Sequence, residues 1–118
     1  MKKILVSAAL LAGALVSASA FAGGDIEAGK AAVKSHNCAA CHGADLNSPI
    51  DPSYPKLAGQ HADYIVHALT SYKRGGDGPN GRSNAIMGAQ AKPLSDKDMQ
   101  DIAAYIHSLP GSLITPQR

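Results

Sequence analysis

The stretch NCAACHGADL, residues 37–46, contains the only two cysteines of this 118-residue chain, Cys38 and Cys41, and His42 directly follows the second. Two cysteines at this spacing serve in several chemistries: a disulfide, part of a zinc site, a redox-active dithiol, or the attachment of a cofactor. Each alternative requires particular residues or a particular fold elsewhere in the chain, so the rest of the sequence distinguishes among them.

Three of these alternatives lack what they need. A disulfide between Cys38 and Cys41 closes a very small ring, which is typical of redox dithiols rather than of structural bridges. A thioredoxin-like dithiol requires a βαβ unit, and the sequence contains no strand pattern. A structural zinc site uses four ligands, and no second Cys or His pair of suitable spacing accompanies the motif.

The remaining alternative is covalent attachment of haem c, for which Cys-x-x-Cys-His is a specific pattern. The thiols of Cys38 and Cys41 would form thioethers with the two vinyl groups of one porphyrin, and His42 would place its imidazole beneath the iron. Small domains often need a cofactor to complete their core. We therefore predict one covalently bound haem c.

The first 22 residues have the form of a secretory signal peptide. A short basic start precedes an uncharged apolar run over 4–16, and small residues in an Ala-x-Ala pattern follow. Cleavage after Ala22 leaves residues 23–118 as a single domain; cleavage after Ala20 also fits, and an uncleaved anchor is the alternative. Because the run is shorter than the roughly 20 residues of a membrane span, we expect export to the periplasm and no stable membrane insertion afterwards.

The charge of the exported part is balanced. The whole chain has 11 Lys and Arg against 9 Asp and Glu, but two of the lysines lie in the expected leader. Nucleic-acid binding depends on neutralising phosphates, so a domain with no net charge, one Phe and no Trp is not expected to bind nucleic acid.

The hydrophobic pattern predicts an all-α domain with three main helices and long loops. Asp25 and Ser95 are expected to be N-caps, and Asp98 stands at the capping-box position after Ser95. The expected helices cover residues 23–35, residues 62–73, and the stretch between Ser95 and Pro110. Residues 43–60 and 74–84, which are rich in Gly and Pro, are expected to be loops.

A second ligand for the iron must come from outside the motif. The available Met and His side chains are Met87, Met99, His36, His61, His67 and His107. Met87 is favoured because its surroundings, residues 85–94, are expected to be irregular and follow a Gly-rich loop that can carry it over the far face of a haem. Met99 is expected to pack in the core, and His36 lies too near Cys38. His/Met ligation is frequent for c-type haem; the alternative is that Met87 only fills a gap in the core.

Beyond these local features, three segments resemble class I cytochromes c. They are CAACHG (38–43), YPKLAGQHADYIVHAL (54–69) and MGAQAKPLSDKDMQDIAAYI (87–106). Together they are similar to the small bacterial cytochrome c-553 and cytochrome c-4 type, and the resemblance extends from about Gly24 to Leu109. Proteins of the c-4 type carry two such domains, so the single-domain c-553 type fits this chain better.

The resemblance implies a class I cytochrome c fold, in which three main helices and their loops wrap around one covalently bound haem. Cys38 and Cys41 would hold the haem, with His42 and Met87 as axial ligands. The carbonyl of Pro55 would accept a hydrogen bond from Nδ1 of His42, and Leu57 would lie against the porphyrin. Gly29 would let the first helix cross the last one closely, against Tyr105.

An iron with both axial positions filled by protein is suited to one-electron transfer, not to bond-making catalysis. We therefore expect a monomeric, non-enzymatic periplasmic electron carrier. Its partners would be redox proteins such as a membrane cytochrome complex, a terminal oxidase or a reductase. The alternatives are an electron-transfer subunit of a larger oxidoreductase and a haem enzyme or gas sensor.

Six cations are expected either to surround the haem edge or to belong to a mixed-charge surface: Lys56, Lys73, Arg74, Arg82, Lys92 and Lys97.

Overall fold

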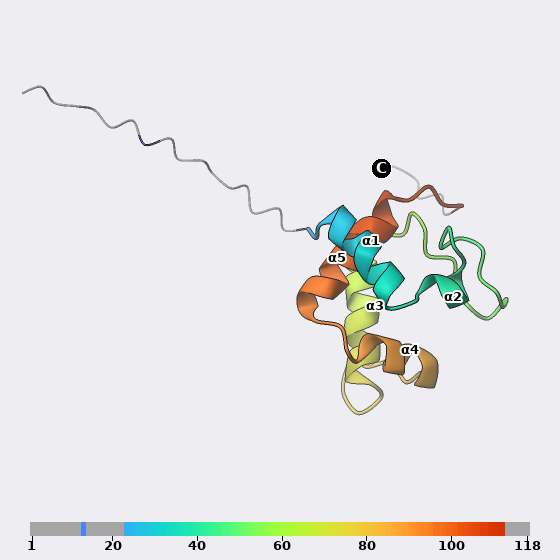
Figure 1. Ribbon diagram of the computed structural model, residues 1–118. Helices are drawn as coiled ribbons and strands as arrows, with labels where there is room; N and C mark the ends of the chain where they lie inside the picture. Colours follow the sequence, from blue (N-terminus) through green and yellow to red (C-terminus); the bar gives the residue numbers. More distant parts are fainter. Residues whose placement is uncertain (1–12, 14–22, 113–118) are drawn as a thin grey trace, which may run out of the picture.

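The computed structural model describes Gly13 and residues 23–112, and this part of the chain is all-helical (Figure 1). Its helices are α1 (Ile26–Ser35), α2 (Ala39–His42), α3 (Ala62–Arg74), α4 (Ala85–Ala91) and α5 (Asp96–Ser108). The all-α prediction is confirmed, and the three main helices of the sequence analysis correspond to α1, α3 and α5. The expected signal peptide (1–22) lies outside the described residues except for Gly13.

Local capping signals set where α1 and α5 begin. The side chain of Asp25 accepts a hydrogen bond from the N–H of Ala28, so α1 begins at Ile26 and not at Gly23. Ser95 and Asp98 form a reciprocal capping box at the start of α5. Both predicted N-caps are therefore confirmed.

Two short helices were not expected. The first is α2, a single turn over Ala39–His42. The second is α4, which occupies Ala85–Ala91 where an irregular stretch was expected, and that expectation was wrong. Asn84 explains the difference, because its side-chain oxygen accepts hydrogen bonds from the N–H groups of Ile86 and Met87 and so caps a new helix.

The first and last helices cross without room for a side chain at Gly29. A Cβ built on Gly29 would lie 1.9 Å from the carbonyl oxygen of Asp101 and 2.8 Å from Cβ of Tyr105. Only glycine permits this approach, so the expected close crossing of the two helices at Gly29 and Tyr105 is confirmed.

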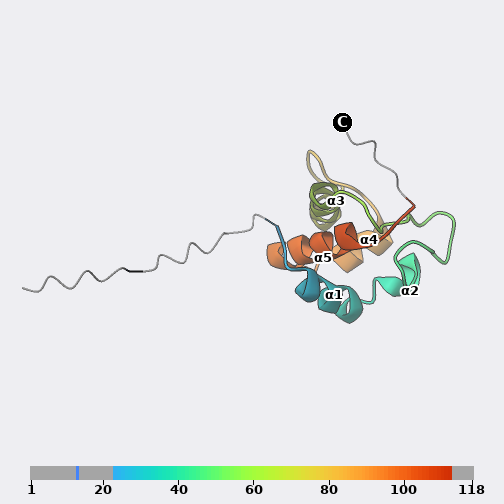
Figure 2. The same cartoon turned by 90° about the horizontal axis from the view of Figure 1, so that it is seen from above.

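Helix α5 lies between α1 and α3 (Figure 2), and α4 packs on α3. The buried core is formed mainly by apolar side chains of these helices and of the loop 43–60: Val33, Leu46, Ala58, Ile65, Leu94, Met99, Ile102, Ala103 and Ile106. Met99 is 2% exposed, as its expected role in packing requires. No helix in the described ranges combines the length and apolar character needed to cross a membrane.

Candidate functional site

The two cysteines lie at the junction of α1 and α2. Asn37 has a positive φ of 57° and turns the chain between the two helices, and Cys38 is the residue immediately before α2. The thiols of Cys38 and Cys41 are free and half-buried. Burial raises the pKa of the Cys38 thiol, whereas reactive redox cysteines have lowered pKa values. This environment disfavours the redox-dithiol alternative.

His42 is buried and held by one hydrogen bond. Its Nδ1 lies 2.9 Å from the carbonyl oxygen of Pro55, the contact that the resemblance implied. A carbonyl oxygen can only accept, so Nδ1 carries the proton and the lone pair of the neutral ring lies on Nε2. The ring of Tyr54 also lies near, with its centroid 6.4 Å from that of His42. The imidazole is therefore oriented with Nε2 available as a ligand.

The loop 43–60 brings Pro55 to His42 through its own backbone hydrogen bonds. Gly43, with a φ of 91°, turns the chain immediately after α2. The N–H of Ile50 donates to the carbonyl of Cys41. The carbonyl of Leu46, which is 1% exposed, accepts from the N–H groups of both Leu57 and Ala58. These bonds fold the long loop back against the cysteine-bearing turn.

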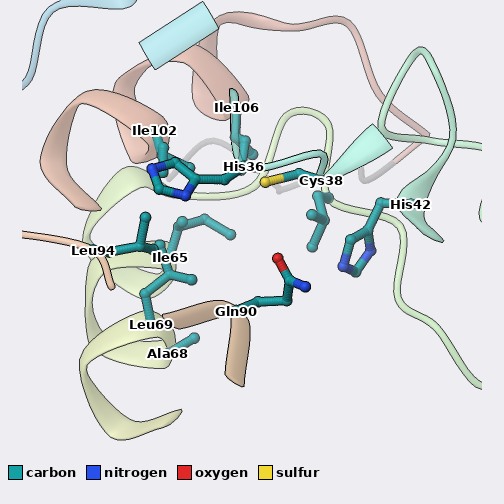
Figure 3. Close-up of a pocket in the computed structure, with 11 residues that line it drawn as sticks. His36, Cys38, His42, Ile65, Ala68, Leu69, Gln90, Leu94, Ile102 and Ile106 are labelled. Carbon is teal, nitrogen blue, oxygen red and sulfur yellow. The ribbon is translucent and has the colours of Figure 1, made fainter. Parts of the chain in front are cut away.

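An almost wholly apolar cavity opens beside Cys38 and His42 (Figure 3). Its apolar walls come from the loop 43–60, from α3, α5 and the segment before α5: Leu57, Ile65, Ala68, Leu69, Leu94, Ile102 and Ile106. In Figure 3 the imidazole of His42 and the sulfur of Cys38 face this space, with Ile65 and Leu94 across from them. Leu57, expected against a porphyrin, lines the same cavity.

Met87 and His42 both line two further cavities, and His42 also lines the first one. One is lined by Cys41, His42, Pro55 and Met87 among others, and the other by both cysteines, His42 and Met87. Helix α4, which Asn84 caps, carries the methionine to this position. The structure thus brings together all six site residues expected from the sequence.

The other methionine and the histidines considered as ligands lie elsewhere, with one exception. Met99 is in the core, while His61 and His107 are exposed and stack on each other with ring centroids 6.3 Å apart. The exposed His67 lines a separate groove. The exception is His36, which lines the apolar cavity together with Cys38.

Three further residues belong to the site although sequence reasoning did not single them out. Tyr54 lies near the ring of His42, Gln90 lines two of the cavities, and Asn84 caps the helix of Met87. The role of Asn84 could have been predicted from the sequence, because Asn before an apolar run is a strong N-cap residue. The other two are placed by tertiary contacts alone.

The profile of the family described as cytochrome c matches residues 26–110. This chain belongs to the cytochrome c family. The resemblance to class I cytochromes c is confirmed, and with it haem binding and electron transport as the family's properties.

Three comparisons show how this cytochrome relates to known proteins. Cytochrome c4 of Stutzerimonas stutzeri is 44% identical over 117 residues, which are 96% of this chain and 53% of that protein. Cytochrome c-554(548) of Halomonas halodenitrificans is 41% identical over 72% of this chain and 96% of its own length. The crystal structure of reduced recombinant cytochrome c4 from Pseudomonas stutzeri matches with a TM-score of 0.65 and 44% identity, over 76% of this chain and 48% of that one. The chain spans about half the length of the cytochromes c4 that it matches.

The residues of this cytochrome fit the covalent haem c of its family. Two free thiols stand at the required spacing, a buried imidazole keeps Nε2 available, and an apolar cavity adjoins both. A zinc site is less compatible, because the described residues contain no group of three or more His, Cys, Asp or Glu placed to hold a metal ion.

Three of the six cations expected around the haem edge make contacts within the domain. The Lys73 ammonium donates to the carbonyl of Leu94, and Lys97 pairs with Asp101. Arg82 lies over tyrosine rings of α3. These three side chains remain exposed, so a ring of cations at the haem edge and a mixed-charge surface both stay predictions.

Proposed function

We propose that this protein is a periplasmic c-type cytochrome with one haem that carries single electrons between redox proteins. The observation that supports this most strongly is the placement of His42 and Met87 around the same cavities as Cys38 and Cys41. In this proposal Cys38 and Cys41 would hold the haem as thioethers, while Nε2 of His42 and the sulfur of Met87 would be the protein ligands of its iron.

The protein residues set the conditions for electron transfer. Haem iron, when bound, supplies the ferric and ferrous states between which one electron is exchanged. Pro55 holds the imidazole of His42 in one tautomer and orientation. The thioether of Met87, a soft ligand, would favour the ferrous state and raise the reduction potential, as would the apolar wall that includes Leu57 and Ile65.

Two protein ligands leave no open position for a substrate, so the proposal is an electron carrier and not an enzyme. Its partners would be redox proteins, such as a membrane cytochrome complex, a terminal oxidase or a reductase. We propose that the mature domain begins at Gly23, after cleavage of the leader, and acts as a monomer in the periplasm.

A spectroelectrochemical titration of the purified holoprotein tests this function. A single transition with a one-electron slope, together with no carbon monoxide binding by the ferrous form, is the expected result. Carbon monoxide binding at native pH would instead indicate a haem enzyme or gas sensor. Size-exclusion chromatography of a native periplasmic extract separates a free carrier from the alternative, a subunit of a larger oxidoreductase, by the elution volume of the haem absorbance.

A further inference from the structure

Arg82, five residues before Met87 in the sequence, lies against two aromatic rings of α3. The guanidinium carbon is 5.5 Å from the ring centroid of Tyr72 and 5.7 Å from that of Tyr64. Both distances are within the range of a cation–π interaction. The backbone N–H of Arg82 also donates to the carbonyl of Ser71, at 3.0 Å. Main chain and side chain of Arg82 thus both attach to the same helix.

The loop before Arg82 closes on the end of α3. Gly75 ends that helix with a φ of 73°, and a Cβ built on Gly81 would lie 1.8 Å from the carbonyl oxygen of Gly75. The two ends of the loop 75–81 are therefore in contact, and the chain returns at Arg82 to the end of α3. Arg82 is the first residue after this closed loop whose side chain contacts the helix.

The segment that follows Arg82 leads directly to Met87. Asn84 caps α4 through the N–H groups of Ile86 and Met87, so the backbone of Met87 is fixed relative to Asn84. Tyr72 connects the two parts, because it contacts Arg82 and also lines a cavity with Met87 and His42. A Cβ on Gly88 would lie 3.7 Å from the carbonyl oxygen of Tyr72, so α4 packs closely on this residue.

We infer that Arg82 is a positioning residue, which holds the start of α4 against Tyr64 and Tyr72 and so keeps Met87 at the cavities that it lines together with His42. This inference rests on the proposed ligation of the haem iron by Met87. Without the Arg82 side chain, the cap at Asn84 would keep α4 helical, but only the direct packing of α4 on α3 and the backbone hydrogen bond from Arg82 to Ser71 would still hold its start in place. The expected consequence is a weaker hold of Met87 on its ligand position.

Cyanide binding to the ferric holoprotein measures this hold, because cyanide must displace the methionine. In Arg82→Gln, loss of two exposed cation–π contacts should raise the apparent cyanide affinity between about 3- and 30-fold. Arg74→Gln is the matched control: it removes the same charge from the last turn of α3 and should leave the affinity unchanged. Arg82→Lys keeps a cation over the rings and should restore part of the wild-type value.

A double-mutant cycle ties the effect to the rings. Tyr64→Leu alone should raise cyanide affinity, but in the Arg82→Gln background it should add less than its single effect, because the shared contact is already lost. Urea unfolding of each variant distinguishes a general loss of stability from a weaker hold on Met87. A general loss lowers the urea midpoint without changing the cyanide affinity of the native protein.

Three results would overturn the inference: equal effects of Arg82→Gln and Arg74→Gln, no effect of Arg82→Gln, or full additivity with Tyr64→Leu. Met87→Ala is measured in the same series. If that variant binds cyanide no better than wild type, the proposed methionine ligation fails; if it binds much better while Arg82→Gln has no effect, the ligation stands and only the role of Arg82 fails.

Discussion

Nδ1 of His42 lies 2.9 Å from the carbonyl oxygen of Pro55, which is thirteen positions further along the chain. Because the pyrrolidine ring fixes φ, Pro55 has fewer backbone conformations to lose when its carbonyl is held at this position. A donor hydrogen bond from Nδ1 increases the basicity of Nε2, which stabilises the ferric state of an iron bound there. In the proposed haem site, the loop 43–60 would therefore influence the electronic properties of the His42 imidazole, which α2 carries.

Replacing Pro55 tests this influence. Pro55→Gly keeps the carbonyl but frees the backbone around it, which should weaken the hydrogen bond and raise the midpoint potential by at most about 60 mV. That limit corresponds to a hydrogen bond of ~1.5 kcal/mol made only in the ferric state. Protein-film voltammetry measures the shift. Pro52→Gly, at an exposed position of the same loop, is the control and should leave the potential unchanged. An equal shift in both variants would show that loop flexibility in general, and not this contact, sets the potential.

Met87→Ala tests the second axial ligand. Without the thioether the potential should fall by on the order of 100 mV, within the ~0.8 V that axial ligands control, and the ferrous form should bind carbon monoxide. Absorption spectra and voltammetry provide both readings, while covalent haem should remain attached. Met99→Leu removes a methionine from the core without touching the site, so both readings should match wild type. An unchanged potential in Met87→Ala would exclude this residue as the ligand.

Gly29→Ala tests the crossing of α1 and α5. The added methyl would lie 1.9 Å from the carbonyl oxygen of Asp101, so the helices must move apart, and the free energy of unfolding should fall by about 1–3 kcal/mol. Urea denaturation of the holoprotein measures the loss. Gly78→Ala, where a Cβ has no neighbour within 4 Å, should change stability by less than about 0.5 kcal/mol. A fully stable Gly29→Ala protein would show that the crossing tolerates a side chain.

Asp101 links α5 to the start of α1 and makes stability depend on pH. Its hydrogen bond from the Lys97 ammonium and that from the Asp25 N–H, at 2.8 Å, lower the pKa of its carboxyl. A lowered pKa means that the folded state favours the charged form. The carboxylate therefore contributes fully above its ordinary pKa of about 3.9 and loses its contribution as the pH falls through the lower, folded value.

Asp101→Asn should consequently lose about 1–2 kcal/mol of stability at pH 7, and the gap to wild type should narrow below about pH 4. Urea midpoints across this range measure it. Lys97→Gln removes only the pairing with an exposed lysine and should cost less than about 1 kcal/mol at neutral pH. A gap between Asp101→Asn and wild type that stays constant down to pH 2 would contradict the assignment to this carboxylate.

The predictable elements of the fold were those with local causes. Asp25 and Ser95 cap helices through bonds to residues three positions away, and the face of α3 follows from a short apolar repeat. The helix α4 was missed although Asn84 is also a local signal, because the neighbouring Gly-rich loop and Pro93 suggested an irregular chain. The N-cap at Asn84, and not the composition of the flanking segments, decided that Ala85–Ala91 is helical.

The sequence alone predicted the chemistry of attachment, since the order Cys38, Cys41, His42 limits the cofactor through spacing within a single turn of chain. Local sequence features favoured Met87 as a site residue, the resemblance added Pro55 and Leu57, and the tertiary structure decided how these residues are placed around the cysteines. Arg82 shows the difference most clearly: in sequence it was one of six surface cations, whereas in the fold it lies over two rings of α3. Contacts of this kind depend on how the whole chain packs, because local interactions along the backbone do not set the distance between residues that are far apart in sequence.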